Sequence, residues 1–136
     1  GIIQQVATPE EIYNNPKNVF VAGFIGQMNF IDVKVENGKF SIENVQFNLP
    51  KEFDKNEITI GIRIEKMISG YKNISAKTDI IEMNGGEKIV YFELNGIKCS
   101  AKVPFNYEFN ENIDLKLDEK DMYFFDKETG LNLLYS

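Results

Sequence analysis

Hydrophobic and polar residues alternate along most of this chain, starting a little after residue 26. In residues 31–35 and 97–103 every second position is apolar, and the positions between them are mostly charged or polar. Side chains of a β-strand point alternately to its two faces, so this period predicts strands with one buried face. The same pattern recurs at 58–62 and 113–117. We therefore expect a mainly β domain over this part of the chain.

Tight-turn signals separate the predicted strands. Asn37-Gly38 and Asn95-Gly96 are residue pairs that tolerate the positive φ angles of a two-residue hairpin turn, and Gly85-Gly86 suits the same purpose. The run Ile74 to Met83 is predicted as one long strand, and Leu131 to Leu134 as the last short strand. Short strands joined by such turns predict an antiparallel OB-like barrel.

The first residues lack this alternation and predict a short N-terminal helical segment. Residues 2–6 are typical of the end of a buried strand. Thr8 is a favourable helix N-cap, the proline after it suits the first helical position, and Glu11 can complete a capping box. Pro16 ends this helix, because the residue before a proline avoids helical geometry.

A second, apolar helix is predicted directly afterwards. Asn18 is its N-cap, Val19 to Ile25 form the helix, and Gly26 ends it. Phe20 and Phe24 are four residues apart and so share one face of the helix. We expect this face to be buried against the barrel or against another part of the protein.

The composition excludes several kinds of function. The 136 residues carry a formal net charge of −6 with a pI near 4.7, which argues against binding of nucleic acid or of an anionic membrane surface. Histidine is absent, so a Ser-His-Asp triad and histidine-based metal sites are excluded. The single cysteine, Cys99, has no partner for an internal disulfide and favours a reducing, intracellular setting.

The motifs of nucleotide hydrolysis are missing as well. No G-x-x-x-x-G-K-[ST] loop is present to hold phosphates, so the chain is predicted not to hydrolyse ATP and to have no catalytic residues and no cofactor of its own. The acidic residues of 108–121 lack the spacing and the central glycine of a calcium loop, and we interpret them as solvated carboxylates. No apolar run approaches the length of about 20 residues that spans a bilayer.

The order of residues in 1–26 resembles the last segment of the ATPase domain in bacterial ABC importers, in the group for maltose, other sugars and glycerol phosphate. The similar positions include the Gln5 to Glu11 stretch and Phe20 to Gly26, while Ala7 replaces the glycine usual before Thr-Pro. Three later motifs resemble the C-terminal regulatory domain of that family, the transport-associated OB (TOBE) domain: Gly61 to Glu65, Glu82 to Glu87 and Phe125 to Leu133. In the first of these, Ile64 stands where the family has proline.

The resemblance implies a domain organisation, partners and a location. Residues 1–26 are expected to be the end of an ABC ATPase domain, and residues 27–136 a regulatory and dimerisation domain that is itself non-catalytic. Mg-ATP would bind in the ATPase domain, outside this chain. The partners implied are a second copy of the ATPase subunit and the transmembrane permease subunits, with the complex at the cytoplasmic, inner face of the plasma membrane. The candidate interface residues are Arg63, Glu65, Glu82, Gly85, Gly86 and Glu87.

A second hypothesis comes from a different class of protein. A freestanding OB-type module that binds a small oxyanion or an oligosaccharide would have similar strands, and it predicts a polar pocket with convergent hydrogen-bond donors. The helical segment at residues 1–26 favours the importer interpretation, because a freestanding module has no use for it.

Overall fold

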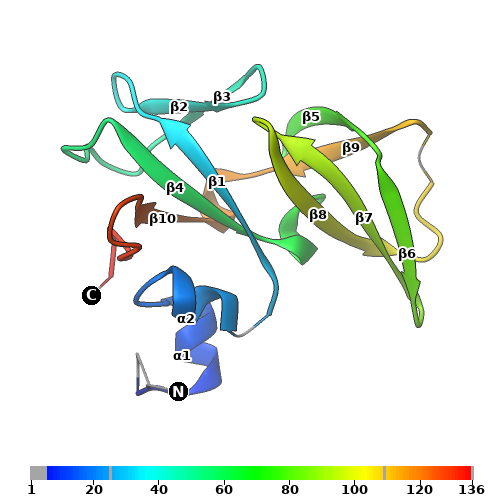
Figure 1. Cartoon of the computed structure of the whole chain (residues 1–136), viewed down its shortest axis with the longest axis horizontal. Helices are drawn as coiled ribbons and strands as arrows, with labels where there is room; N and C mark the ends of the chain where they lie inside the picture. Colours follow the sequence, from blue (N-terminus) through cyan, green and yellow to red (C-terminus); the bar gives the residue numbers. More distant parts are fainter. Residues whose placement is uncertain (1–5, 25, 109, 136) are drawn as a thin grey trace.

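The structure is a computed structural model that describes residues 6–24, 26–108 and 110–135 (Figure 1). The predicted strand end at residues 2–6 therefore lies outside the described residues except for Val6, which is exposed and in no regular structure. None of the described helices is long and apolar enough to cross a membrane.

Ten strands and four short helices follow one another along the described chain. In order they are α1 (Pro9–Asn14), α2 (Val19–Phe24), β1 (Met28–Lys34), β2 (Lys39–Ile42), β3 (Val45–Asn48), β4 (Glu57–Arg63), the 3₁₀ helix η1 (Ile64–Lys66), β5 (Lys72–Lys77), β6 (Ile80–Asn84), β7 (Glu87–Leu94), β8 (Ile97–Pro104), β9 (Asn112–Leu117), the 3₁₀ helix η2 (Glu119–Asp121) and β10 (Met122–Asp126).

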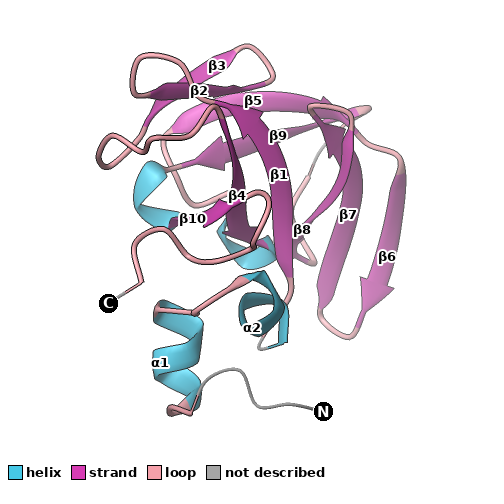
Figure 2. Ribbon diagram, turned by 60° about the vertical axis from the view of Figure 1, so that its left-hand side comes forward, coloured by secondary structure: helices cyan, strands magenta, loops and turns pink. Residues whose placement is uncertain are grey.

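The strands form four antiparallel sheets, with the orders β1-β4-β10, β2-β3, β5-β9 and β6-β7-β8. Figures 1 and 2 show the β6-β7-β8 sheet on the side of the molecule away from β10, with both helices below β1 and β4. The prediction of a mainly β fold is confirmed. The described strand pairs do not join the four sheets into a closed barrel, so the predicted OB-like barrel is not confirmed.

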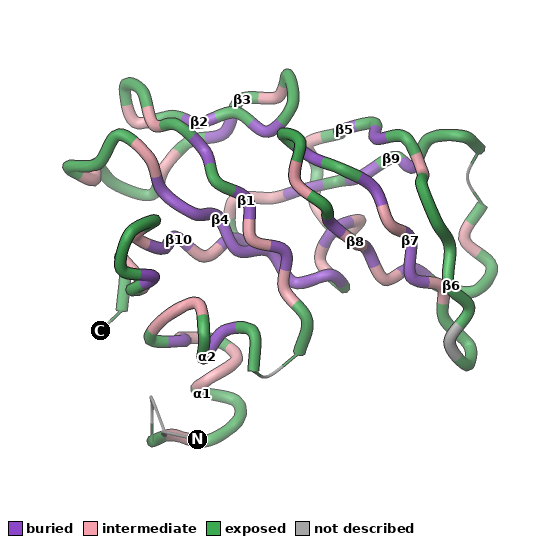
Figure 3. Tube along the Cα trace, in the orientation of Figure 1, coloured by how far each residue is buried: buried purple, intermediate pink, exposed green. Residues whose placement is uncertain are grey.

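One hydrophobic core lies between the sheets, and Figure 3 shows its buried segments along β4, β7 and β8. The predicted alternation is clearest in β8 and β9, where every second side chain is buried. In β4 the last six residues are all buried, because elements cover both faces of this strand. Gly61 lies there against Met28 and Phe125, where a Cβ atom would come within 2.6 Å of the Met28 sulfur.

The predicted long strand from Ile74 to Met83 is wrong, since the structure divides it into β5 and β6. The chain changes partners at Thr78 and Asp79: the Thr78 N–H donates to the Glu111 carbonyl (2.8 Å) and the Asp79 N–H to the Tyr91 carbonyl (2.8 Å). Strand β5 pairs with β9, whereas β6 pairs with β7. A continuous β pattern in sequence does not reveal such an exchange of partner.

The predicted last strand, Leu131 to Leu134, is also wrong. Only two isolated bridges form there, Asn18 with Leu131 and Phe125 with Asn132. The first of these connects the C-terminal turn to the start of α2, where the Val19 N–H also donates to the Gly130 carbonyl (2.9 Å). The backbone of this region thus bonds both to β10, through the Asp126 N–H to the Leu131 carbonyl (2.8 Å), and to the N-terminal segment, without forming a further strand.

Helix α1 begins as predicted, with Thr8 and Glu11 forming a reciprocal capping box. The Asn18 side chain caps α2 by accepting from the Val21 N–H (2.8 Å). Phe20 and Phe24 are 63% and 78% exposed, so the predicted burial of this face of α2 against the barrel is wrong, and its burial against another part of the protein stays a prediction. The helix turns Val21 and Ala22 inward, and a six-residue helix has room for only one buried face.

Candidate functional site

The Arg63 side chain connects the helical segment to the sheet. It lies at the end of β4, is 1% exposed and points toward the two helices. One terminal nitrogen, Nη1, donates to the Ala22 carbonyl (2.6 Å), and the other, Nη2, donates to the Tyr13 carbonyl (3.2 Å). A single guanidinium therefore holds a carbonyl from each helix.

The position of these carbonyls explains why an arginine suits the place. Carbonyls in the last turn of an α-helix have no partner within the helix, and both Tyr13 and Ala22 are in the last turns of their helices. A guanidinium has five N–H donors in a planar fork, so it can serve two diverging carbonyls at once. It also stacks on aromatic rings, and its central carbon lies 4.3 Å from the Tyr13 ring centre and 5.7 Å from that of Tyr123.

Two tyrosine hydroxyls complete this arrangement, which we call the Arg63 joint: Arg63 with Tyr13, Tyr123 and Glu65. The Tyr123 hydroxyl donates to the Tyr13 carbonyl (2.8 Å), and the Tyr13 hydroxyl donates to Glu65 Oε2 (2.7 Å). Burial and the hydrogen bond to Glu65 raise the pKa of Tyr13 to about 12. Burial also raises the pKa of Tyr123, although the charge of Arg63 opposes it. Both hydroxyls therefore stay protonated as donors at neutral pH.

A groove of about 350 Å³ lies beside the Arg63 joint. One wall consists of Gly26–Gln27 and Ile64–Glu65, and the other is the face of β6, β7 and β8. We call this the acidic groove, because it is lined by three carboxylates and one lysine: Glu65, Glu82, Glu87 and Lys102.

Two of these carboxylates have partners on neighbouring strands. Glu87 forms an ion pair with Lys102 (3.2 Å), where both side chains are largely exposed. Tyr91 lies in the same groove, and burial together with a hydrogen bond to Glu82 raises its pKa. With one lysine against three carboxylates, the groove suits positively charged or hydrogen-bond-donating groups.

The six predicted interface residues thus fall into three places. Glu65, Glu82 and Glu87 come together at the acidic groove, although 22 residues of sequence separate the first from the last. Arg63 lies behind the groove and faces the helices. Gly85 and Gly86 form the tip of the β6–β7 hairpin, where Gly85 adopts φ +65°, as the first central position of a type II′ turn requires.

Sequence reasoning missed the tyrosines and the lysine of the site: Tyr13, Tyr91, Tyr123 and Lys102. Lys102 had a usable signal, because the Asn95-Gly96 turn fixes the register that puts Ile89 opposite Lys102. Tyr13 and Tyr123 had none, since 110 residues separate them and only the folded chain brings them together. Among the described residues no group of acidic or cysteine side chains is placed to hold a metal ion.

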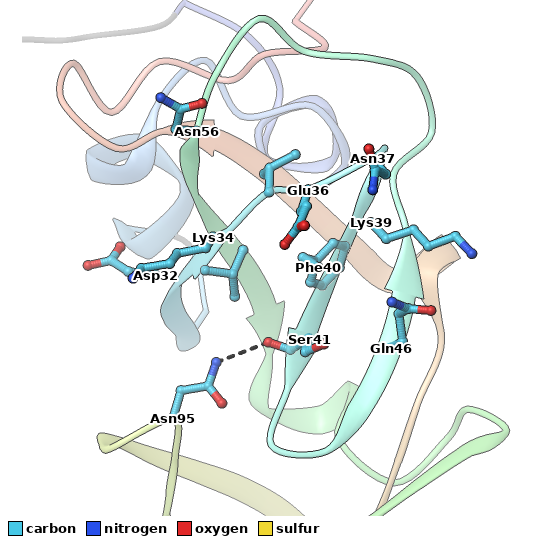
Figure 4. Close-up of a pocket in the computed structure, with 12 residues that line it drawn as sticks. Asp32, Lys34, Glu36, Asn37, Lys39, Phe40, Ser41, Gln46, Asn56 and Asn95 are labelled. Atoms are coloured by element: carbon cyan, nitrogen blue, oxygen red, sulfur yellow. Dashed lines mark hydrogen bonds between the residues drawn. The ribbon is translucent and has the colours of Figure 1, made fainter.

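A larger hollow of about 920 Å³ lies above β1 and β2 (Figure 4). Its charged side chains balance in sign, and Figure 4 shows Asp32 and Lys39 extending away from each other on opposite sides. At its lower edge Asn95 Nδ2 is already used, because it donates to the Ser41 carbonyl (3.1 Å). This arrangement does not provide the convergent donors that an oxyanion site needs.

The chain is similar to ABC transporter ATP-binding proteins over almost its whole length. It is 37% identical to the uncharacterised ABC transporter ATP-binding protein YcjV of Escherichia coli (strain CFT073), covering 96% of this chain and 41% of that protein. It is 32% identical to the trehalose/maltose import ATP-binding protein MalK of Thermococcus litoralis, with the same coverage of each chain.

A third relative is the oligosaccharides import ATP-binding protein MsmX of Bacillus subtilis, at 30% identity over 98% of this chain and 42% of the relative. The chain therefore spans about two fifths of the length of the curated relatives it matches. No protein-family model matches it.

Proposed function

We propose that this chain is the C-terminal, non-catalytic regulatory part of the ATP-binding subunit of an ABC importer. The observation that carries the proposal is the similarity to ABC transporter ATP-binding proteins across 96–98% of the chain, combined with the absence of a phosphate-binding loop from its sequence. Because the segment has no loop of this kind to hold phosphates, we expect that it takes no part in ATP hydrolysis.

The same comparison supports a proposal for the solute and the partners. Two of the relatives are named for the import of trehalose and maltose or of oligosaccharides, and we propose a sugar or a related polar solute for this protein. Mg-ATP would bind in the ATPase part of the subunit. The subunit would pair with a second copy and with transmembrane permease subunits, and so lie at the inner face of the plasma membrane.

The Arg63 joint offers a route by which a movement of the N-terminal helices could reach the sheet. We propose that residues 1–26 are the end of the ATPase domain and residues 27–136 the regulatory domain. The Arg63 joint lies across this boundary, because Arg63 belongs to β4 and its acceptors belong to α1 and α2. A movement of the helices would then be passed to β4, and through it to the acidic groove.

A chimera tests the proposal directly. In a Bacillus subtilis strain whose growth on an oligosaccharide depends on MsmX, this chain replaces the part of MsmX to which it aligns. We expect growth and oligosaccharide uptake to return. The matched control carries Arg63→Glu in the same fusion, which breaks the Arg63 joint and should lower uptake without changing the ATP-binding motifs.

Two outcomes would contradict the proposal. One is a fusion that accumulates at the level of native MsmX and binds ATP but supports no uptake. The other is an MsmX truncated before this segment that grows as well as the chimera, because the segment would then contribute nothing. In a parallel assay the isolated chain, mixed with Mg-ATP, should release no phosphate above buffer, and saturable turnover would contradict a non-catalytic role.

A further inference from the structure

Strand β6 is an open edge of the β6-β7-β8 sheet. Among the described strands it pairs only with β7, and Figure 2 shows it at the outer border of the sheet. Its apolar side chains are unusually exposed for a strand: Ile80 is 62% exposed, Ile81 44% and Met83 55%. A strand edge presents unpaired N–H and C=O groups, which is the template for pairing with another chain.

The hairpin turn determines which backbone groups are free to pair. The turn at Gly85-Gly86 closes on the pair Asn84 and Glu87, and hydrogen-bonded pairs alternate with non-hydrogen-bonded pairs in an antiparallel ladder. The N–H and C=O groups of Ile81 and Met83 therefore point away from β7. Natural edges are commonly protected by lysine, proline or a bulge, and β6 contains neither lysine nor proline.

The charged side chains around β6 indicate which kind of segment could pair with its edge. Glu82 is its only charged residue and shares a face with Glu87, on the side of the acidic groove. Asp79 is exposed at the beginning of the strand. The two neighbouring lysines already have partners. Lys102 pairs with Glu87 within the acidic groove. Lys88 lies on the opposite face of the sheet and donates to the Tyr107 carbonyl (3.4 Å).

We propose that β6 is a docking strand for an extended, basic segment of a partner protein, which adds to the sheet by antiparallel or parallel strand pairing. Backbone hydrogen bonds to Ile81 and Met83 supply the attachment, as in other cases of strand addition. Lysine or arginine side chains of the segment face Glu82 and the acidic groove, and its apolar side chains lie beside Ile81 and Met83.

A second copy of this chain fits the same edge less well. Two copies of β6 paired in antiparallel fashion would bring the two Glu82 side chains onto neighbouring positions, and each chain carries a formal net charge of −6. Like charges opposite or diagonal to each other on a sheet are destabilising. Charge complementarity therefore selects a basic segment over self-pairing.

Peptide binding to the full chain tests this proposal. The probe is a short peptide in which lysine and valine alternate, and its counterparts are the glutamate–valine peptide and the lysine–valine peptide with a central proline. Affinity is measured by fluorescence anisotropy at low and high salt, and the site is mapped by amide chemical shifts of the labelled chain. We expect the lysine–valine peptide to bind at least about tenfold more tightly than either counterpart, more weakly in high salt, with shifts centred on Ile81 and Met83.

Two matched pairs of variants locate the contact. Ile81→Pro removes an outward N–H without removing a ladder hydrogen bond, and Ile81→Val keeps that N–H. Glu82→Lys reverses the charge at the docking strand, and Glu128→Lys makes the same change on the far turn. We expect Ile81→Pro and Glu82→Lys each to weaken binding about tenfold, and their controls to bind as the original chain does.

Three results would overturn the proposal. The first is equal affinity of the chain for the basic and the acidic peptide. The second is undiminished binding of the basic peptide by both the Ile81→Pro variant and the Glu82→Lys variant. The third is self-association of the chain in sedimentation that Ile81→Pro abolishes. The last result would assign the edge to a second copy. If Ile81→Pro fails to fold, the comparison of Glu82→Lys with its control Glu128→Lys decides. Because the chimera test of the importer function does not involve these peptides, either proposal can fail alone.

Discussion

At the scale of single residues, Arg63 shows how the carbonyls at two helix ends help to accommodate a buried charge. Its terminal nitrogens meet the carbonyls of Ala22 and Tyr13, and its flat face meets the Tyr13 ring. Helix ends supply carbonyls that have no partner in the helix and carry partial negative charge, so they can compensate a cation. The arginine thus donates to both carbonyls, and the Tyr13 carbonyl accepts from the Tyr123 hydroxyl as well.

Substitution of Arg63 should be costly. Arg63→Met removes the donor to the buried Ala22 carbonyl, while the Tyr13 carbonyl keeps the hydrogen bond from the Tyr123 hydroxyl, so we expect the free energy of unfolding to fall by about 1–3 kcal/mol. The measurement is urea denaturation, with hydrogen exchange at α1 and α2 as a local readout. Lys98→Met, at an exposed position of β8, is the control and should change stability by less than about 0.5 kcal/mol. Equal effects of the two substitutions would show that the joint contributes nothing.

The residue scale also shows what a sequence can reveal about this site. The capping box of Thr8 and Glu11 was predictable, because both partners lie within one helical turn and the chemistry is local. The partners of Arg63 were not, since its acceptors lie 41 and 50 positions earlier in the chain. A strand-end arginine followed by Glu65 indicated a polar contact, but nothing in its neighbourhood indicated two helix ends as the acceptors.

At the scale of elements, α2 corrects a simple amphipathicity argument. Spacing placed Phe20 and Phe24 on one face, and this geometry is right, but the inward face carries the smaller Val21 and Ala22. Periodicity identifies a face and does not say which face is buried when apolar residues occupy most of the helix.

A pair of substitutions in α2 tests this orientation. Val21→Ala removes two buried methyl-sized groups, and at about 0.8 kcal/mol per group plus a cavity term we expect a loss of about 1–3 kcal/mol. Phe24→Ala removes far more volume from a side chain that is 78% exposed, and it should change stability by less than about 0.5 kcal/mol. Thermal unfolding of the two variants is the measurement. A larger loss for Phe24→Ala would mean that α2 is rotated relative to this description.

Helix η2 is held against two sheets by hydrogen bonds to a single carboxylate, that of Glu119. Glu119 accepts from the Asn48 N–H of β3 (3.0 Å), from Lys72 Nζ of β5 (3.0 Å) and from the Tyr71 hydroxyl (2.9 Å). Partial burial alone would raise the pKa of Glu119, but these three donors outweigh it and lower the pKa to about 2. The ionised form is therefore favoured by folding.

The consequence is a defined loss of stability in acid. A depressed pKa contributes stability above the unfolded value near 4.5, and this contribution is lost as the pH falls from about 4.5 to about 2. Glu119→Gln should therefore flatten the dependence of stability on pH in this interval, while Glu108→Gln, at an exposed position, should leave it unchanged. Urea denaturation at several pH values measures the slope. An unaltered slope in Glu119→Gln would refute the assigned role.

The elements also show where strand prediction ends. The hairpin at Asn95-Gly96 was predictable, because both turn residues adopt positive φ and the β7–β8 pairing follows from the turn. Asn37 and Gly38 also adopt positive φ, but only the bridge of Glu36 with Lys39 forms beside them, because β1 pairs with β4 and β2 with β3. The division of Ile74 to Met83 into β5 and β6 was not, since it depends on β9, whose pairing residues lie more than 30 positions further along the chain. Local pattern determines strand content here, and distant partners determine which sheet each strand joins.

At the scale of the whole molecule, the net negative charge of the chain affects whether two copies associate. With a formal net charge of −6 per chain, like charges oppose association most strongly at low salt, and added salt screens this repulsion. We expect a monomer at micromolar concentration, with dimers only at high concentration and favoured by salt. Sedimentation at several concentrations and two ionic strengths is the measurement. A tight dimer that dissociates on addition of salt would mean that pairs of opposite charge hold the copies together.

The order of strands in the β1-β4-β10 sheet has a consequence for synthesis of the protein. Strand β4 is central in space, yet one of its two neighbours, β10, is the last strand of the described chain to leave the ribosome. Until then β4 pairs along one edge only, with β1, and the N–H and C=O groups of its other edge lack the strand that they pair with in the folded chain. Nascent chains that stall before Met122 would leave this strand edge exposed to aggregation and to chaperones, so this sheet is completed only after β10 has been synthesised.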